Sequence, residues 1–311
     1  MSKKDPLRFF RRCRFSPGEI ARVRTLVREN GTALILPYDQ FLEHDTRHLE
    51  AGPDAARPEF ILDLGETAGF NAVAFHIGIA KRYWSKIEGR LPLILKLNGK
   101  TSVPSDDQAL SVHTSYVEDA VRLGAVAAGY TLYYGSPRQD VDLPQLAQVR
   151  KECDRYGLPL VVWAYPRGSA VDAKGGKESS YALESAARLA MEMGASIVKS
   201  NLPKAGPDGY LKNEKIPKYY RDLEGDLSKL GALEQKRERA RRVVDAAQGI
   251  PVLFSGGDGK GEAEVIENAK ACAEAGCFGY IIGRNSWKRP KAEGAALAGR
   301  LRDVLDAAQP K

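Results

Sequence analysis

The sequence predicts an α/β fold, a (β/α)8 TIM barrel with an N-terminal helical extension. Short runs rich in Val, Ile and Leu recur along the 311 residues and are apolar almost throughout, which is typical of parallel strands covered on both faces. The segments between them carry helical spacing, and a glycine repeatedly separates helix from strand. Such alternation over about 250 residues is typical of a closed barrel. The alternative, a doubly wound open sheet, usually carries G-x-G-x-x-G after its first strand, where this chain has P-Y-D-Q-F-L-E-H.

The expected helices and strands follow one another in regular order. The segment V-E-D-A-V-R-L-G-A places Val117, Ala120 and Val121 on one helical face, followed by Gly124 before the next strand. The same helix–glycine–strand order recurs at R-Y-G-L, E-M-G-A, A-Q-G-I and E-A-G-C. We expect eight strands, at residues 32–37, 72–77, 93–97, 126–132, 160–165, 196–200, 251–256 and 279–284.

The chain is expected to form one catalytic domain behind a short leader. Residues 1–30 form the N-terminal extension, which contains the helical pattern P-G-E-I-A-R-V-R-T-L-V-R-E-N and is closed by Gly31. Residues 31–311 form the (β/α)8 barrel domain. After the sixth expected strand, residues 201–233 are rich in Lys, Gly, Pro and Asp and are predicted to be a long loop. On the catalytic face of a barrel, this loop could act as a lid or contribute to an interface.

The composition indicates a globular protein of the cytoplasm. The chain is 43% apolar and 28% charged, and it begins with no signal-peptide pattern. No apolar run reaches the ~20 residues that span a bilayer. Lys and Arg exceed Asp and Glu by 47 to 40, mostly through residues 3–14 and 236–242. Neither stretch interleaves aromatic side chains as a nucleic-acid platform does, so we expect no nucleic-acid and no membrane partner. Residues 236–242 are predicted to be a solvated helix face.

The sequence offers few side chains that could bind a metal ion or take part in redox chemistry. It contains four His and four Cys, with no H-x-H, H-E-x-x-H or C-x-x-C spacing. The cysteines, Cys13, Cys153, Cys272 and Cys277, are expected to be reduced and mostly buried thiols. We therefore expect neither a metal nor another cofactor.

One lysine, Lys199, lies inside the otherwise apolar expected strand A-S-I-V-K-S. Facing the helices it would be a buried unpaired charge, which is costly. Facing the barrel mouth beside other cations, its amine would have a lowered pKa and would be nucleophilic. The alternative is an ion-paired structural lysine. Lys96, in the third expected strand, has the same ambiguity and receives a secondary role.

A serine, three glycines and an arginine lie at the carboxyl ends of the last two expected strands: Ser255, Gly256 and Gly257 at the seventh, and Gly283 and Arg284 at the eighth. Glycines let backbone N–H groups approach a phosphate, Arg284 adds a charged donor, and the helix that follows adds its dipole. These two loops form the common phosphate site of TIM barrels. We therefore predict a phosphate site here, with ordinary loop glycines as the alternative.

A strand lysine beside a phosphate site implies imine chemistry on a phosphorylated carbonyl compound. The lysine attacks a ketone, and the protonated imine then draws electrons for C–C cleavage or formation. Tyr165 and Asp39, at the ends of the fifth and first expected strands, are the candidates for handling protons and hydroxyl groups.

Between about residues 31 and 305, the chain carries in order the motifs I-L-P-Y-D-Q-F-L-E-H, L-K-L-N, G-Y-T-L-Y-Y-G-S, V-V-W-A-Y-P-R-G, A-S-I-V-K-S, F-S-G-G and I-I-G-R-N. With these motifs the chain resembles the archaeal-type (DhnA-like) class I fructose-1,6-bisphosphate aldolases of the DeoC/DhnA superfamily. The resemblance implies a Schiff-base, metal-independent lyase of glycolysis and gluconeogenesis. Such an enzyme reversibly cleaves fructose 1,6-bisphosphate to dihydroxyacetone phosphate and glyceraldehyde 3-phosphate.

The resemblance also implies a role for each matching position. Lys199 would form the Schiff base, Tyr165 would shuttle protons, and Trp163 would line the site and orient the substrate. Asp39 would bind substrate hydroxyls and assist imine formation. Arg167 would contact the substrate or its second phosphate. The triose phosphate would be held by the residues of the two loops, Ser255, Gly256, Gly257, Gly283 and Arg284.

Several alternatives stay open at this point. Related lysine-dependent aldolases, transaldolase-like synthases and a thiolase share the lysine and the phosphate site. A phosphosugar isomerase would keep the barrel without the imine, and a basic nucleic-acid-binding protein is the non-enzymatic alternative. The chain departs from the resembled family at Phe41, where a glycine usually follows the strand-1 aspartate, and this bulk could narrow the site. As partners we expect a phosphorylated sugar substrate and further copies of this chain, as a homo-oligomer.

Overall fold

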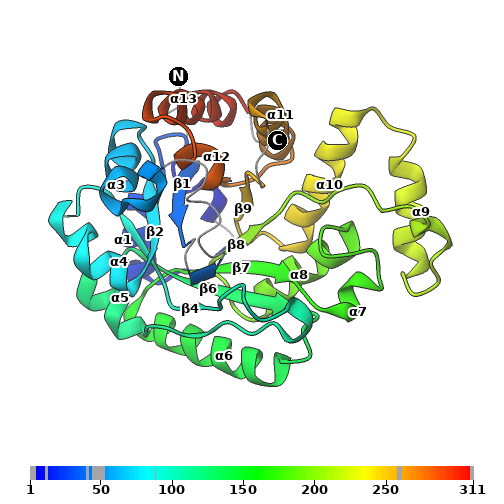
Figure 1. The fold of residues 1–311 in the computed structure, drawn as a ribbon, viewed down its shortest axis with the longest axis horizontal. Helices are drawn as coiled ribbons and strands as arrows, with labels where there is room; N and C mark the ends of the chain where they lie inside the picture. The colour runs from blue at the N-terminus through cyan, green and yellow to red at the C-terminus, as the bar shows by residue number, and fades with distance from the viewer. Residues whose placement is uncertain are drawn as a thin grey trace.

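Parallel strands close into an eight-stranded barrel in the part of the chain that the structure describes (Figure 1). The structure is a computed structural model that describes residues 5–10, 13–39, 42–43, 53–87, 89–257 and 261–308. All eight expected strands are confirmed, each within a few residues of its expected bounds. They are β1 (Ala33–Tyr38), β2 (Ala72–His76), β3 (Leu93–Lys96), β6 (Ala127–Tyr134), β7 (Leu160–Pro166), β8 (Ile197–Ser200), β9 (Val252–Ser255) and β10 (Gly279–Ile281).

The strand order is β1-β10-β9-β8-β7-β6-β3-β2, so strands that follow one another in the chain are neighbours in the sheet. The last strand, β10, closes the ring by pairing in parallel with β1. Because every barrel pair is parallel, all carboxyl ends meet at one end of the barrel, where TIM-barrel enzymes carry their active sites. The register places Lys199 of β8 directly beside Trp163 of β7.

Helices surround the barrel on its outside (Figure 1). Two of them, α5 and α6, end at Gly124 and Gly157, whose φ angles of 71° and 59° are left-handed and free of strain for glycine. The helix predicted in the N-terminal extension is α1, which ends at Leu26. The helices are α1 (Pro17–Leu26), α3 (Pro58–Thr67), α4 (Ile77–Arg82), α5 (Val117–Leu123), α6 (Gln139–Tyr156), α7 (Ser169–Asp172), α8 (Ser180–Glu192), α9 (Lys218–Leu227), α10 (Ala232–Ala246), α11 (Glu262–Glu274), α12 (Arg284–Trp287) and α13 (Lys291–Ala307).

Alternating side chains along the strands divide the apolar interior into two cores. Leu34 and Val198 point outward and pack under the helices, whereas Ile35 and Ile197 point inward and fill the barrel. This alternation is the period of two that a strand imposes on its side chains. Since Ile197 points inward, Lys199, two residues further along β8, faces the barrel interior as well.

The N-terminal extension packs against the barrel instead of standing apart from it. Phe10, Val23 and Leu26 belong to the inner core. The Phe10 ring meets Phe278, just before β10, edge to face with centroids 5.0 Å apart. Phe278 lies at the amino end of its strand, so the extension covers that end of the barrel. Chemistry at the strand ends must therefore use the opposite, carboxyl end.

Residues 201–233 differ from the long loop that we predicted. They contain the 3-10 helix η6 (Tyr210–Lys212) and the helix α9, before α10 begins at Ala232. Figure 1 shows α9 standing beyond α10, outside the ring around the barrel. Its inner face carries Glu224 together with Leu227. Six of the ten residues of α9 (K-Y-Y-R-D-L-E-G-D-L) are charged or glycine, and this polar composition explains why the sequence analysis predicted a loop here.

A short antiparallel pair at the carboxyl end of the barrel was also not expected. It consists of β4 (Asn98–Gly99) and β5 (Val112–His113), and strands of two residues leave no periodicity in a sequence. Among the residues with described positions, no helix is both long and apolar enough to cross a membrane.

Candidate active site

Lys199 projects from β8 into the carboxyl end of the barrel. Its Nζ lies 4.3 Å from the ring centroid of Tyr165 and 5.9 Å from that of Trp163, both on the neighbouring strand β7. The side chain is buried, with 6% of its surface exposed. Lys199 therefore faces the predicted site and not the layer of helices.

The surroundings of Lys199 favour its neutral amine. Burial lowers the pKa of Lys199 to about 7; Asp39 and Glu43 act in the opposite direction, while Lys96 and Arg284 add to the lowering. An amine with this pKa is about half unprotonated at neutral pH, whereas an ordinary lysine is almost entirely protonated. A free amine in a site lined by cations is the arrangement that makes lysine a nucleophile.

The other predicted catalytic residues lie near this amine. Tyr165 is half-buried at the end of β7, and Trp163 is almost fully buried in the inner core. Asp39, which is buried, follows β1 directly. Its influence on the pKa of Lys199 shows that the carboxylate lies within electrostatic reach of the amine. The structure thus brings these three residues together with Lys199.

The two predicted phosphate loops are joined to each other. The Asn285 Nδ2 donates to the carbonyl oxygens of Gly256 and Gly257 at 3.2 and 3.1 Å, which ties the start of α12 to the loop after β9. Gly257 has a φ of 70° and is exposed. The Gly256 N–H, in contrast, donates to Ile281 O at 3.2 Å and is engaged within the protein. Gly256 therefore contributes close packing, because a Cβ there would lie 2.9 Å from Ile282 Cγ1.

The remaining members of these loops lie at the same end of the barrel. Ser255 ends β9, and its Oγ donates to Asn201 Oδ1 in the loop after β8. At Gly283, a Cβ would lie 2.9 Å from Pro37 O, so only glycine fits against β1. Arg284 begins α12, and its charge acts on the pKa of Lys199. All five predicted phosphate residues thus lie on the ends of the adjacent strands β9 and β10.

Arg167 follows β7 and is engaged in contacts of its own. Its Nε lies 3.1 Å from Asp106 Oδ2, and its guanidinium carbon is 5.3 Å from the Tyr165 ring centroid. Burial would raise the pKa of Asp106, but Arg167 and Lys100 outweigh that effect and lower it. Arg167 is thus held beside Tyr165, at the end of a strand that β8 separates from β9.

Sequence reasoning missed the side chain of Glu43. Its carboxylate accepts a hydrogen bond from Lys96 Nζ at 3.2 Å, and Lys96 also donates to Thr131 Oγ1. Lys96 is fully buried, and its Nζ lies 4.6 Å from the Trp163 ring centroid. Glu43 lies within the motif D-Q-F-L-E-H, four residues after Asp39, and its N–H donates to Asp39 O at 3.1 Å. That spacing, one helical turn, is the signal that could have found it.

One histidine also lies at the carboxyl end of the barrel, next to Lys96. His76 ends β2, beside Lys96 in the register, and neither of its buried ring nitrogens has a hydrogen-bond partner among the described residues. Burial, and then the nearby Lys96, lower the pKa of His76 to about 4. The imidazole is therefore neutral at physiological pH.

Phe41 lies outside the described residues.

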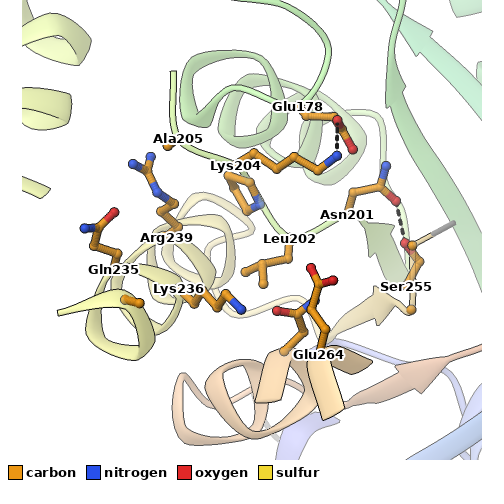
Figure 2. Close-up of a pocket in the computed structure, with 15 residues that line it drawn as sticks. Glu178, Asn201, Leu202, Lys204, Ala205, Gln235, Lys236, Arg239, Ser255 and Glu264 are labelled. Atoms are coloured by element: carbon orange, nitrogen blue, oxygen red, sulfur yellow. Dashed lines mark hydrogen bonds and ion pairs between the residues drawn. The ribbon is translucent and has the colours of Figure 1, made fainter. Parts of the chain in front are cut away.

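A cavity of about 520 Å³ lies next to the loops after β8 and β9 (Figure 2). It opens between α10, α11 and the loops after β8 and β9, and it shares Asn201 and Ser255 to Gly257 with the site. Lys199, Tyr165 and Asp39 are absent from its lining. We therefore place the chemistry at the strand ends, where the nucleophile lies, and regard the cavity as a neighbour of the phosphate loops.

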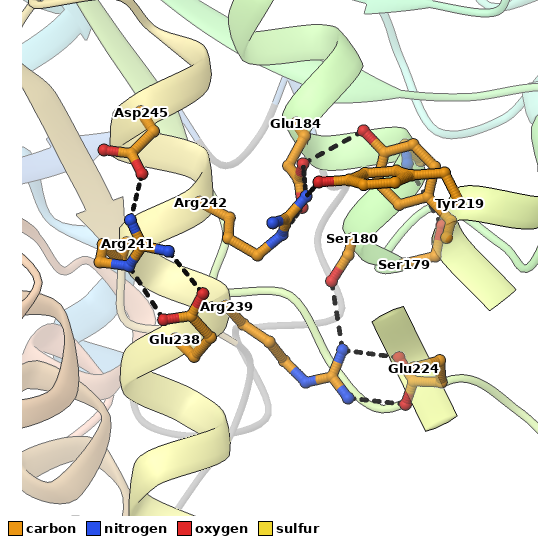
Figure 3. Close-up of polar contacts among 12 residues, drawn as sticks. Ser179, Ser180, Glu184, Tyr219, Glu224, Glu238, Arg239, Arg241, Arg242 and Asp245 are labelled. Carbon is orange, nitrogen blue, oxygen red and sulfur yellow. Dashed lines mark hydrogen bonds and ion pairs between the residues drawn. The ribbon is translucent and has the colours of Figure 1, made fainter. Parts of the chain in front are cut away.

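The helix α10, which lines that cavity, corrects our prediction of a solvated basic face (Figure 3). Arg239 is only 2% exposed and donates to both carboxylate oxygens of Glu224 in α9, at 2.8 and 2.6 Å. Arg242 donates to Glu184 of α8 at 2.9 Å through two nitrogens. The prediction was wrong for these two arginines, because their partners come from distant elements. Arg241 and Arg237, in contrast, have local partners on their own helix: Glu238 and Asp245 for Arg241, and Glu234 for Arg237.

In the described ranges, no three His, Cys, Asp or Glu side chains form a group that could hold a metal ion. All four cysteines of the chain are unpaired, three of them buried.

Comparison with known proteins identifies aldolases as relatives of this chain. The family model of DeoC/LacD family aldolases matches residues 33–289. The class 1 fructose-bisphosphate aldolase of Thermoproteus tenax is 36% identical over 263 residues, covering 84% of this chain and 86% of that protein. A 2-amino-3,7-dideoxy-D-threo-hept-6-ulosonate synthase of Halobacterium salinarum is 30% identical over 240 residues, 76% of each chain.

Two solved structures are similar over nearly their whole length. One is a Schiff-base-forming fructose-1,6-bisphosphate aldolase, with a TM-score of 0.76, 32% identity, and coverage of 92% of this chain and 99% of that one. The other is an archaeal fructose-1,6-bisphosphate aldolase whose catalytic lysine is bound to the carbinolamine intermediate, with a TM-score of 0.74, 32% identity, and coverage of 92% and 98%. The chain belongs to the DeoC/LacD family of aldolases, as a relative of the archaeal class 1 fructose-bisphosphate aldolases.

Proposed function

We infer that the protein is a class I fructose-bisphosphate aldolase, a lyase that works through a Schiff base on its own lysine. The observation that carries this function is the buried Lys199, with its pKa lowered to about 7, between two aromatic rings and beside the paired loops after β9 and β10. The substrate is fructose 1,6-bisphosphate, and the products are dihydroxyacetone phosphate and glyceraldehyde 3-phosphate. The relatives at 36% and 32% identity carry this activity in their names.

Imine formation opens the reaction. The unprotonated Nζ of Lys199 attacks the C2 carbonyl of the open-chain sugar and forms a carbinolamine. Protonation of the C2 hydroxyl then expels water and leaves a positively charged iminium. Asp39 binds the substrate hydroxyls and assists this step, since it lies within electrostatic reach of the amine.

Carbon–carbon cleavage follows from the charge of the iminium. A base takes the proton of the C4 hydroxyl, the C3–C4 electron pair moves into the iminium, and glyceraldehyde 3-phosphate leaves. The remaining neutral enamine receives a proton at C3, and water hydrolyses the resulting iminium to release dihydroxyacetone phosphate. We assign the proton transfers to Tyr165, whose ring lies 4.3 Å from the Lys199 nitrogen, and the orientation of the sugar to Trp163.

The phosphates anchor the sugar on either side of the imine. Ser255, Gly257, Gly283 and Arg284 hold the phosphate of the dihydroxyacetone half, through backbone donors, the guanidinium and the start of α12. Gly256 permits the close packing of this loop against Ile282. Arg167, at the end of β7, contacts the other half of the substrate, where its ion pair with Asp106 keeps the guanidinium in place.

A cleavage assay on a panel of phosphorylated sugars tests this function. The wild-type protein should cleave fructose 1,6-bisphosphate faster than the other sugars, retain that activity in EDTA, and lose it in Lys199→Met. Glu192→Gln, an exposed carboxylate on the far end of α8, is the matched control and should keep wild-type activity. Undiminished turnover by Lys199→Met would instead favour a barrel isomerase without an imine.

A related synthase is the second candidate, because one curated relative with that name is 30% identical over 76% of the chain. It would use the same lysine and phosphate site on another phosphosugar. The same substrate panel separates the two activities, since a synthase should show little net cleavage of fructose 1,6-bisphosphate.

We further propose that the protein works in the cytoplasm as a homo-oligomer. Four unpaired cysteines agree with a reducing compartment. Large apolar side chains exposed near the β4–β5 pair, Val103, Val112 and Tyr116, offer a surface for self-association. Light scattering coupled to size-exclusion chromatography measures the oligomeric state, and a monomer in solution would contradict the proposed homo-oligomer.

A further inference from the structure

A second buried lysine shares the barrel mouth with Lys199. The Nζ of Lys96 donates to Glu43 at 3.2 Å and to Thr131, and the Lys96 and Glu43 side chains expose only 0% and 6% of their surface. Removing two charges from water is costly, and the attraction between them often does not recover that cost. An ion pair in this position is therefore poorly explained by stability alone.

Trp163 connects the two lysines. The Nζ atoms of Lys96 and Lys199 lie 4.6 and 5.9 Å from the centroid of its ring. Aromatic rings attract cations, so the indole is a fixed support for both side chains. Gly129 of β6 makes the arrangement possible, because a Cβ there would lie 2.8 Å from Trp163 Cζ3 and 3.0 Å from Lys96 Cδ.

Charges face Lys199 from several elements. Asp39 after β1 and Glu43 favour its ammonium form, whereas Lys96 of β3 and Arg284 of α12 disfavour it. Lys96 acts more strongly on the pKa of Lys199 than Glu43 does, so the net influence of the pair is that of a positive charge. The ring of Tyr165, from β7, attracts the ammonium in addition.

We propose that Lys96 is a positioning residue for the Schiff base. Glu43 and Thr131 hold its ammonium beside Trp163, where it opposes a second positive charge on Lys199 and keeps the Lys199 amine free to attack the carbonyl. This inference rests on the proposed function, because only a lysine that forms an imine gains from being neutral.

The same fixed charge assists the cleavage step. When the C3–C4 electron pair enters the iminium, the positive charge on nitrogen disappears and a neutral enamine remains; the C4 hydroxyl proton goes to the base. A nearby positive charge destabilises the iminium relative to the enamine, and so favours the cleavage. Lys96 thereby favours the two neutral species, the free amine that attacks the carbonyl and the enamine that cleavage leaves, without contact with the sugar.

Variants at Lys96 test the proposal through the titration of Lys199. Imine formation is measured as the rate at which cyanoborohydride and dihydroxyacetone phosphate fix an adduct on Lys199, mapped by mass spectrometry, from about pH 6 to about pH 9.5. In Lys96→Met, the pH at which the rate reaches half its maximum should rise by roughly 0.5–1 unit. Lys96→Arg, which retains the charge, should restore the wild-type midpoint. Lys218→Met, on exposed α9, is the control and should leave it unchanged.

In Lys96→Met, the carboxylate of Glu43 is buried without its partner. If this prevents the variant from folding, a double variant takes its place. Lys96→Met/Glu43→Gln removes both charges, and its midpoint should also rise, because Lys96 has the larger influence. If Lys96→Met or the double variant folds and its midpoint is unchanged, the proposal is overturned. The proposal is also overturned if the midpoint of Lys96→Arg rises as much as that of Lys96→Met. If the wild type traps dihydroxyacetone phosphate in those experiments, the proposed function still stands. If the wild type traps no adduct at all, the proposed function itself is wrong and this inference falls with it.

Discussion

The titration of Lys199 gives imine formation a pH dependence with a calculable shape. With its pKa lowered from 10.5 to about 7 by burial, Lys199 gains its free amine as the pH rises through neutrality. The unprotonated fraction is about one tenth at pH 6 and about nine tenths at pH 8. The rate of imine formation should therefore rise about tenfold over this interval and then level off.

An ordinary lysine gives a different curve. With a pKa of 10.5, its unprotonated fraction is very small near neutrality and rises about tenfold for each pH unit, with no plateau below pH 9. The two cases thus differ most above pH 8. The difference in shape between the two pH–rate curves depends only on the pKa of the lysine, and not on the absolute rate.

The assay is the pre-steady-state rate of imine formation with a ketone, followed by cyanoborohydride trapping on Lys199. Dihydroxyacetone should be compared with its phosphate ester, because a phosphate monoester itself titrates near pH 6. Nα-acetyl-lysine in the same buffers provides an amine with an ordinary pKa. A rate that keeps rising tenfold per unit through pH 9, parallel to this control, would refute the assignment of a neutral, buried Lys199.

Three further outcomes follow from the packing and the ion pairs. Gly129→Ala, whose Cβ would lie 2.8 Å from Trp163 Cζ3, should cost about 1–3 kcal/mol in urea unfolding and slow cleavage by displacing Trp163; unchanged values would contradict the described packing. Arg239→Met leaves Glu224 buried without its ionic partner and should cost about 3–5 kcal/mol, whereas Arg239→Met/Glu224→Gln should recover most of that loss in the same measurement. Equal losses in both would indicate that the pairing is unimportant. Arg167→Met should raise the KM for fructose 1,6-bisphosphate more than it lowers kcat, and an unaltered KM would remove Arg167 from the substrate contacts.

The fold could be predicted from the sequence because its signals are local. Each strand is a largely continuous apolar run, and a glycine separates helix from strand at five junctions, so that the order of elements alone indicates a barrel. The parallel barrel then brings strand ends together without further information. Lys199, Tyr165 and Arg284 could be placed near one another for this reason.

The contacts that sequence reasoning missed join residues distant in the chain. Glu43 and Lys96 are 53 positions apart, and nothing in the periodicity of either segment pairs them. Arg239 belongs to a basic stretch that we predicted to be solvated, but its partner Glu224 lies in α9, a helix whose polar composition we had read as a loop. The engaged N–H of Gly256 likewise depends on the backbone of the next strand, Ile281 O, and only three-dimensional packing reveals it.

Covalent trapping on the intact protein decides most directly whether Lys199 is the Schiff-base residue. The protein is reduced with borohydride in the presence of dihydroxyacetone phosphate, and its peptides are mapped by mass spectrometry. We predict a single adduct on Lys199, with the mass of dihydroxyacetone phosphate less one oxygen atom, and none without the ketone. An adduct on Lys96 or another lysine, or no adduct in a protein that still cleaves fructose 1,6-bisphosphate, would contradict the mechanism.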